Sequence, residues 1–553
     1  MTARHFRVAA ILFALLISPA GESAAVNKPK LVVQITADQL RGDLLERYRS
    51  VLTDGLARIE NGGYWIRRGR VDHGLTLSFP GHATLSTGMY PSHHGLTANE
   101  WWENQRGQWG EVAVSADGHF RMLDPPERPG PSPRNMTATT LGEWIKSSDP
   151  RSKSVALGTG NSIPIAYGGK QLDAVYWFDE SSGRFTSSTY YTQTMASWVS
   201  EFNAGQLPNY EMQTWTLSVP SAATGLSNPD ATPYENQGRF NTFPHAYALE
   251  SRPQRDGSNA MSYSRWFART PLKDEALFAL AAAAVDAEKL GGRGVTDYLA
   301  VDVDSTDEVG HIYGPLSLEQ LDTLVRLDRA LGRFLRHLDA TIGKDNYVLA
   351  FSADHGVADP PEAGGGGRRI RSSEIEAVLD RVDAIAASAT VSRDALIQTI
   401  VAELKRSDFI ADAYPEAQLA ASSEDPFVQL YQHSYRPGFT TDFPLWTERD
   451  RPHHPARYGI LVRFKENMVF DAATGIHGSP YAAERLVPII FYGMNIKAGN
   501  QDSGGRTVDV APTLAAAAHI ASPAGLDGAV LGNVLCSDKP GGKIPVTDSP
   551  SCR

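Results

Sequence analysis

Three aspartates and three histidines in the sequence have side chains that could hold metal ions. Asp307 and His311 are four residues apart, so on a helix both side chains would point the same way. Asp354 and His355 are adjacent and precede a glycine. Any one of these residues could instead be a helix cap, a turn residue or a core histidine, but mixed oxygen and nitrogen donors are typical of zinc sites. The candidate ligands are Asp38, Asp307, His311, Asp354, His355 and His477.

A candidate nucleophile lies between the first and second of these ligands. Ser78 comes just before Pro80 and Gly81 and a helix-like stretch. A hydroxyl attacks at neutral pH only when a base or a metal ion activates it, and a helix N-terminus favours an anionic phosphoryl group. Spacing alone leaves two alternatives open, namely that Ser78 is a simple N-cap and that Thr76 is the nucleophile.

The elements that must position these residues alternate between strand and helix. Apolar runs at 31–37, 298–303 and 347–353 are typical of buried parallel strands, and each precedes an acidic residue. Helical patterns occupy 275–289 and 317–338, the second opening on a Ser–x–x–Gln capping box. This alternation predicts an α/β fold with helices on both faces of the sheet. Sites in such folds form at the carboxyl ends of the strands, where the acidic residues fall.

Composition limits the classes of partner. The chain has 553 residues, a formal net charge of −11 and only two cysteines. The negative charge argues against binding of nucleic-acid duplexes or anionic membranes, which need a basic face. Two cysteines cannot form a disulfide scaffold or a cysteine-rich metal site.

The N-terminal residues 1–25 read as a secretory signal peptide, with two arginines before the apolar run 8–17. Ten apolar residues are too few to span a bilayer, which needs about 20. The mature protein is therefore expected to be exported, into the periplasm if the source is Gram-negative, with no transmembrane span. Cys536 and Cys552 could then form a disulfide in the tail 536–553.

One catalytic domain is expected over 26–535. Within it, residues of roughly 175–270 are rich in aromatic and small polar side chains and have little helical periodicity. We interpret this range as an insertion or cap over the sheet that shapes the substrate pocket.

Six ordered motifs together resemble the alkaline phosphatase superfamily, in particular its phosphate-irrepressible alkaline phosphatase branch and the related nucleotide pyrophosphatase/phosphodiesterases. The resemblance covers nearly the whole mature chain and ends near the stretch 508–513. Its motifs are Thr36–Arg41, Ser78–His82, His94–Asn99, Ser305–His311, Ala353–Gly356 and His477–Pro480.

This resemblance implies a three-layer α/β/α sandwich and a hydrolase with two Zn²⁺ ions. Asp307, His311 and His477 would hold one zinc. Asp38, Asp354 and His355 would hold the other, with Ser78 as its exchangeable ligand. Ser78 would attack phosphorus to give a phosphoserine, and Asn99 would hydrogen-bond a phosphoryl oxygen. The family commonly has threonine at the nucleophile position, a chemically mild difference.

A second departure from the family concerns specificity. The monoesterase branch carries a Lys–x–Arg pair that contacts the phosphoryl oxygens, whereas this chain has Gly158 and Gly160 in the matching segment. Losing two cations should weaken binding of a dianionic monoester more than that of a monoanionic diester. We therefore expect phosphodiesterase specificity for a small-molecule phosphate ester, unless Lys170 or Arg134 supplies a substitute cation.

Other functions remain as alternatives. The first is a phosphomonoesterase of the alkaline phosphatase type. The second, from a different class, is an inactive zinc-binding exported domain. A sulfatase is disfavoured because His82 replaces the arginine of the sulfatase motif and the ligand set suits two zinc ions better than one calcium. A phosphoglycerate mutase relative is disfavoured because export would separate it from glycolysis.

Overall fold

A nine-stranded sheet forms the centre of the molecule, in the order β18-β2-β17-β11-β1-β10-β7-β8-β9. The computed structural model describes residues 28–105, 108–160, 162–210, 213–252, 261–364, 366–440, 453–470, 473–536 and 552. The predicted signal peptide and most of the tail lie outside these residues. The strands are β1 (Leu31–Ala37), β2 (Tyr64–Arg70), β7 (Ser154–Gly158), β8 (Ala174–Asp179), β9 (Arg184–Thr186), β10 (Asp297–Val303), β11 (Tyr347–Ser352), β17 (Leu486–Gly493) and β18 (Gly499–Gln501).

Five neighbouring strands in the middle of this sheet are parallel. β1 pairs with β10 on one side and β11 on the other, and the parallel pairing continues through β7 to β8. All seven residues of β1 are buried, as expected for a strand covered on both faces. Because side chains alternate along a strand, Val33 and Ile35 pack in one core cluster and Val32 packs in the other.

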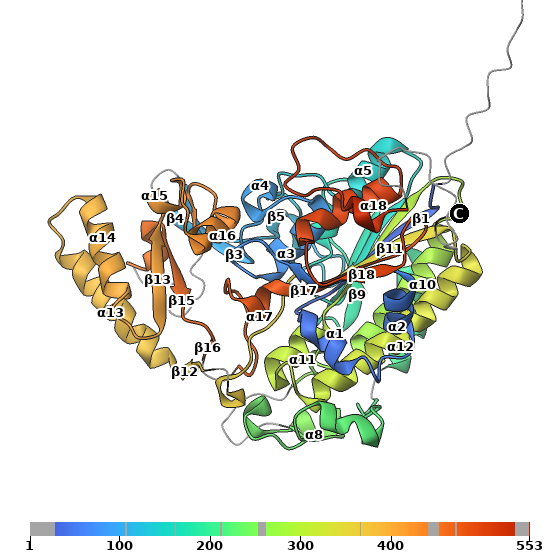
Figure 1. Ribbon diagram of the computed structural model, residues 1–553, viewed down its shortest axis with the longest axis horizontal. Helices are drawn as coiled ribbons and strands as arrows, with labels where there is room; N and C mark the ends of the chain where they lie inside the picture. Colours follow the sequence, from blue (N-terminus) through green and yellow to red (C-terminus); the bar gives the residue numbers. More distant parts are fainter. Residues whose placement is uncertain are drawn as a thin grey trace, which may run out of the picture.

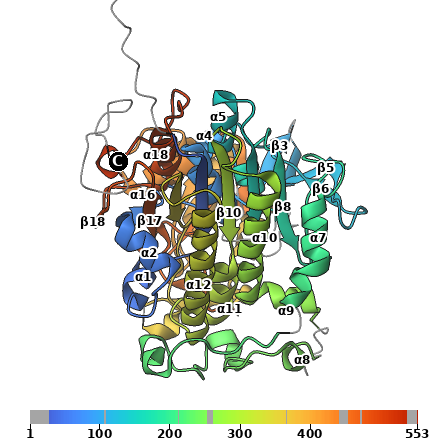
Figure 2. The ribbon, with the colours of Figure 1, turned by 90° about the vertical axis from the view of Figure 1, so that its right-hand side faces the viewer.

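Helices cover both faces of the sheet (Figure 2). One face carries α1 (Gly42–Tyr48), α2 (Gly55–Gly62), α10 (Leu272–Glu288) and α12 (Leu318–Thr341). The other face carries α5 (Leu141–Ser148), α6 (Ile165–Gly168) and α18 (Val510–Ala517). Helix α12 begins where the sequence predicts, since the Ser317 side chain accepts a hydrogen bond from the Gln320 amide at 3.0 Å. The predicted α/β class is confirmed.

A separate lobe lies to the left in Figure 1. It contains α13 (Ser372–Ser388), α14 (Arg393–Leu404) and the antiparallel pair β13 (Ile410–Pro415) and β15 (Ile460–Phe464). These elements bury a hydrophobic cluster of their own. The sequence analysis did not anticipate this lobe.

The range 175–270 is only partly an insertion. Its first residues form β8 and β9 of the central sheet, so the aromatic run Tyr176–Phe178 is buried strand. The remainder includes α7 (Ser197–Gly205), α8 (Tyr247–Glu250) and α9 (Tyr263–Ala268). Aromatic residues are favoured in buried strands as well as in loops, which is why composition alone misplaced the boundary.

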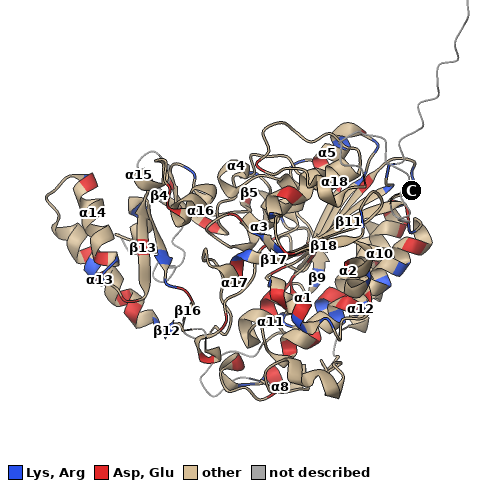
Figure 3. Ribbon diagram, in the orientation of Figure 1, with Lys and Arg blue, Asp and Glu red and all other residues tan. Residues whose placement is uncertain are grey.

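The surface and the tail add two observations. Lys/Arg and Asp/Glu are interspersed along helices such as α12 and α13 (Figure 3). Cys536 and Cys552 are joined by a disulfide, with their Cα atoms 5.4 Å apart. Among the described residues, no helix is both long enough and apolar enough to cross a membrane.

Candidate active site and metal centre

The acidic residues meet at one edge of the sheet because the strands that carry them are neighbours. Asp38 directly follows β1, and Asp354 follows β11 after one alanine. Asp307 lies in α11 (Ser305–Tyr313), which begins after β10. Since β10 and β11 flank β1 in parallel, their carboxyl ends lie side by side.

Asp307 forms the centre of a first group of donors. Its Oδ1 lies 3.3 Å from His311 Nε2 and 3.7 Å from His477 Nε2. The rings of His311 and His477 are 5.0 Å apart. His477 reaches this group from the loop between β16 (Met468–Phe470) and α17 (Ala482–Arg485). The structure thus brings together all three residues expected at the first metal position.

A second group contains the other three expected ligands. His355 Nε2 lies 3.1 Å from Asp354 Oδ2 and 3.4 Å from Asp38 Oδ1. The His355 ring also stacks on His477 at 3.8 Å, so it lies between the two groups. Donor atoms of Asp38, Asp354 and His355, and likewise those of Asp307, His355 and His477, all fall within 4.8 Å of one another.

These residues fit metal ions. Asp38 Oδ1 is buried and has no hydrogen-bond partner among the described residues, which is costly unless a cation binds there. Burial, together with neighbouring Asp354 and Asp307, raises the pKa of Asp38 well above its usual value. Burial and the stacked His355 ring lower the pKa of His477 to about 3, whereas Asp307 raises the pKa of His311 to about 9 despite its burial.

Ser78 is the first residue of α3 (Ser78–Thr87) and points toward the second group. Its Oγ lies 3.5 Å from His355 Nε2. Leu77 occupies the N-cap position, so Ser78 is not the N-cap that spacing allowed. The Thr76 hydroxyl, by contrast, donates to Glu484 Oε2 at 2.9 Å and does not line the pocket beside Ser78.

Gly81 allows α3 to approach the second group closely. A Cβ at this position would lie 2.6 Å from the backbone oxygen of Asp354. Asn99 then fixes the start of the helix, because its Oδ1 accepts a hydrogen bond from the Phe79 amide at 3.1 Å. That bond leaves the Asn99 NH₂ group as a donor. Asp38, Ser78, Phe79 and Asn99 line one pocket of about 300 Å³.

His82 is a functional neighbour whose role the sequence analysis missed. Its Nδ1 lies 2.8 Å from the Ser78 backbone oxygen and 3.2 Å from Asp354 Oδ2, and its Nε2 lies 2.9 Å from Asp302 Oδ1. Although burial opposes it, contact with Tyr167, Asp354 and Asp302 raises the pKa of His82 well above its usual value. Both ring nitrogens have hydrogen-bond partners, so His82 links Asp302 and Asp354 to the backbone of Ser78.

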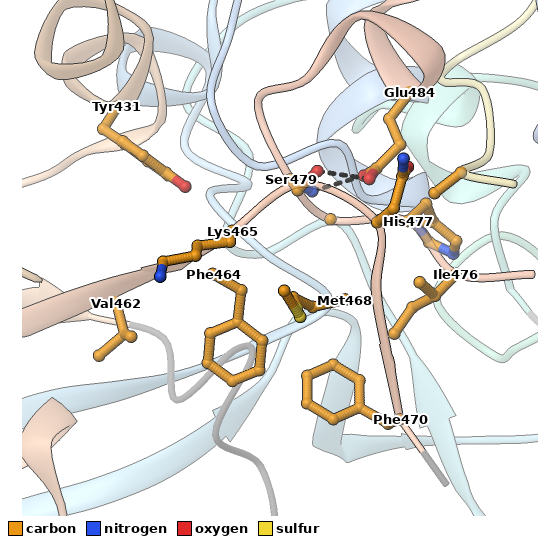
Figure 4. Close-up of a pocket in the computed structure, with 13 residues that line it drawn as sticks. Tyr431, Val462, Phe464, Lys465, Met468, Phe470, Ile476, His477, Ser479 and Glu484 are labelled. Carbon is orange, nitrogen blue, oxygen red and sulfur yellow. Dashed lines mark hydrogen bonds between the residues drawn. The ribbon is translucent and has the colours of Figure 1, made fainter. Parts of the chain in front are cut away.

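Gln39 and Glu484 are two further supports that only the tertiary structure reveals. Gln39 Nε2 donates to Asp307 Oδ1 at 2.6 Å. Glu484 accepts hydrogen bonds from the amide and hydroxyl of Ser479, which lies two residues beyond His477 (Figure 4). Burial raises the pKa of Glu484 to about 7. The only hint in the sequence is that Gln39 directly follows Asp38.

The charged residues that line the 300 Å³ pocket are acidic. They are Asp38, Glu180, Asp304 and Glu308, with no lysine or arginine among the described lining residues. Lys170 and Arg134 are exposed and do not line it, so neither supplies the cation considered above. At Gly158 a Cβ would lie only 2.6 Å from Asp302 Oδ2, so this position has no room for a side chain.

The parallel sheet, the paired donor groups at its carboxyl edge and the adjacent hydroxyl define a phosphoric ester hydrolase of the alkaline phosphatase superfamily. A family model described as type I phosphodiesterase / nucleotide pyrophosphatase matches residues 32–424. The chain belongs to this family. The predicted superfamily, and with it the prediction of an enzyme, are confirmed.

Two similar proteins are named alkaline phosphatases. Alkaline phosphatase PhoV of Synechococcus elongatus is 29% identical over 540 residues, covering 94% of this chain and 95% of that protein. Alkaline phosphatase PafA of Elizabethkingia meningoseptica is 32% identical over 347 residues, covering 61% of this chain and 62% of that protein. A crystal structure of wild-type PafA has a TM-score of 0.79 at 25% identity and covers 92% of this chain and 100% of that chain.

Proposed function

We propose that this chain is an exported, two-metal phosphodiesterase that acts through a covalent phosphoserine at Ser78. The observation that carries the proposal is the pocket in which Ser78, Asn99 and Asp38 lie together with acidic residues and no cationic side chain. Its substrate is a small-molecule phosphate diester.

Two Zn²⁺ ions fit the donors. Asp307, His311 and His477 would hold one, and Asp38, Asp354 and His355 would hold the other together with Ser78. Zinc at such sites acts as a Lewis acid and lowers the pKa of hydroxyl groups near it. The role of the chain is to fix the donors, through His82 and Gln39, and to keep the histidine rings in the tautomer that binds metal.

Ser78 is the nucleophile in this proposal. Its Oγ attacks phosphorus, the bond from phosphorus to the leaving alcohol oxygen breaks, and water then hydrolyses the phosphoserine. Its place in the first turn of α3 supports this role, because the dipole of the helix favours a negative phosphoryl group at that end. The Asn99 NH₂ group would donate to a non-bridging oxygen.

Diester specificity follows from charge. A monoester dianion has one more negative charge than a diester monoanion at neutral pH. Glu180 and Glu308 line the same pocket as Ser78, so they would repel the extra charge, and no lysine or arginine among the described lining residues would offset it. The second candidate function is alkaline phosphatase activity, which the names of the relatives PhoV and PafA favour.

A comparison of kcat/KM for bis(p-nitrophenyl) phosphate and p-nitrophenyl phosphate tests the proposal. Both release the same alcohol, so leaving-group chemistry does not bias the ratio. We expect the diester to be preferred by about tenfold or more, the factor that corresponds to about 1.4 kcal/mol. Faster hydrolysis of the monoester would establish alkaline phosphatase activity instead. No hydrolysis of either by metal-loaded protein would favour the inactive zinc-binding alternative.

The proposal that the protein is exported rests on the predicted signal peptide and on the disulfide. The disulfide between Cys536 and Cys552 needs an oxidising compartment to persist. In a Gram-negative cell the periplasm is such a compartment. Fractionation of cells that express the full chain, with N-terminal sequencing of the product, tests for cleavage after Ala20 or Ala25.

A further inference from the structure

A buried ion pair forms part of the wall of the reactive pocket. Lys273 is the second residue of α10, and its ammonium donates to Asp304 Oδ2. The side chain of Lys273 is 1% exposed, whereas that of Asp304 is 13% exposed. Asp304 lines the pocket with Ser78 and Asn99, and Lys273 does not. The carboxylate therefore faces the reacting groups, and the ammonium lies behind it.

The position of Asp304 is fixed by its backbone. Its amide donates to Thr159 Oγ1 at 3.2 Å and lies 3.3 Å from Asp274 Oδ1. The Thr159 hydroxyl donates to the same Asp274 oxygen at 2.7 Å. The next amide in the chain, that of Ser305, donates to Asp274 Oδ2 at 3.1 Å. Asp304 thus begins the turn into α11 in one defined conformation.

The pair lies directly beside Gly160. A Cβ on Gly160 would be 3.3 Å from Asp304 Oδ1 and 3.0 Å from Asp302 Oδ2. The segment that lacks cationic side chains of its own is therefore adjacent to the Lys273 ammonium, which belongs to a different helix. The carboxylate that pairs with this ammonium is itself a lining residue of the pocket.

We propose that Asp304 and Lys273 act as a charge selector, in which the Asp304 carboxylate neutralises the Lys273 ammonium and so excludes dianionic monoesters from the pocket. The inference deepens the proposed function, on which it rests. A cation next to the phosphoryl site would attract the second charge of a monoester. Once the carboxylate cancels that cation, the carboxylates of Glu180 and Glu308 in the same pocket disfavour a dianionic monoester more than a monoanionic diester.

Asp304→Asn tests the proposal. Asparagine keeps the shape and can still accept the Lys273 hydrogen bond, but it removes the carboxylate that the ammonium contacts and leaves Glu308 and Asp274 as its acidic neighbours. We expect the monoester/diester ratio of kcat/KM to rise about tenfold, within the range that one charged neighbour produces. Asp304→Ser, which is smaller, should move the ratio in the same direction.

The double variant Asp304→Asn/Lys273→Met distinguishes an effect of charge on the ratio from general damage to the structure. It removes both charges, so the ratio should return to within about threefold of the wild-type value, a reversal that only coupled residues give. General damage would lower the turnover of both substrates and would not be reversed by a second substitution. Lys153→Met, which breaks the pair with Glu288 at the other end of α10, is the matched control and should leave the ratio unchanged.

Two results would overturn the proposal that Asp304 and Lys273 act as a charge selector. One is an unchanged ratio in both Asp304 variants with metal content and melting temperature intact. The other is a raised ratio that persists in the double variant. Neither depends on which ester the wild-type enzyme prefers, so failure of the selector is distinguishable from failure of diester specificity.

Discussion

The Nδ1 atom of His477 lies 2.7 Å from the backbone oxygen of Thr76, although the two residues are 401 positions apart in the chain. This bond places the ring proton on Nδ1 and turns Nε2 toward Asp307. Because Thr76 is two residues before Ser78, one hydrogen bond couples the geometry of a candidate metal ligand to that of the proposed nucleophile. The Gly478 amide adds a second link between the two segments, because it donates to the Thr76 hydroxyl at 2.9 Å.

Glu484 strengthens this coupling, and its replacement should loosen the metal. Its carboxylate accepts from the Thr76 hydroxyl at 2.9 Å and from the Ser479 amide at 2.6 Å. We expect Glu484→Gln to weaken metal affinity about 10- to 100-fold, as loss of a supporting hydrogen bond to ligands does. Competition with a chromogenic chelator measures the metal affinity of the wild type and of the variant. Glu466→Gln, an exposed neighbour, should not change the affinity.

Ser78→Ala should abolish turnover while the metal stays bound. Loss of a covalent nucleophile lowers kcat by about 1,000-fold or more. Ser78→Thr keeps a hydroxyl and should remain within about tenfold of the wild type. Steady-state kinetics and metal analysis of the same samples test this prediction. Full activity of the alanine variant would contradict the assignment of Ser78.

Removal of metal should lower both activity and stability. Without cations, the carboxylates of Asp38, Asp307 and Asp354 and the facing histidines lose their bound partner. A metal held at 100 times its dissociation constant stabilises the folded state by about 2.7 kcal/mol per site. We expect a chelator to abolish hydrolysis and to lower the melting temperature, and added Zn²⁺ to restore both. Unchanged activity after verified metal removal would contradict a metal centre.

His245 should make stability fall at alkaline pH. It lies between Glu250 and Glu319, at 3.0 and 3.2 Å, and despite its burial these carboxylates raise its pKa to about 9. Since the unfolded pKa is about 6.5, the contribution is fully present below pH 6.5 and is lost as the pH rises through 9. A shift of this size corresponds to about 3 kcal/mol at most.

Urea denaturation at pH 6.5 and pH 9.5 tests the role of His245. The free energy of unfolding of the wild type should fall between these values by more than that of His245→Gln. The exposed His119 pairs with Asp117, and His119→Gln serves as the control because a solvated pair contributes little. An equal fall in the wild type and in His245→Gln would contradict the prediction.

The sequence by itself determined the chemistry. The strands that end in Asp38, in Asp304 and in Asp354 are local patterns of apolar residues, so their type and the polarity of their ends could be predicted. Parallel strands share their carboxyl edge, and the donors were therefore expected together. The sequence also shows Gly158 and Gly160 in the segment where, by the resemblance, the monoesterase branch carries a Lys–x–Arg pair.

Only the tertiary structure decided which residues complete the site. The separate lobe, the strand β8 inside the supposed insertion and the pairing of Lys273 with Asp304 all depend on contacts between distant segments. The same holds for Thr76, whose hydroxyl looked like a candidate nucleophile until Glu484 was found 2.9 Å away. Local sequence specifies the conformation and chemistry of a segment, whereas long-range packing specifies its neighbours, and charge selection depends on the neighbours.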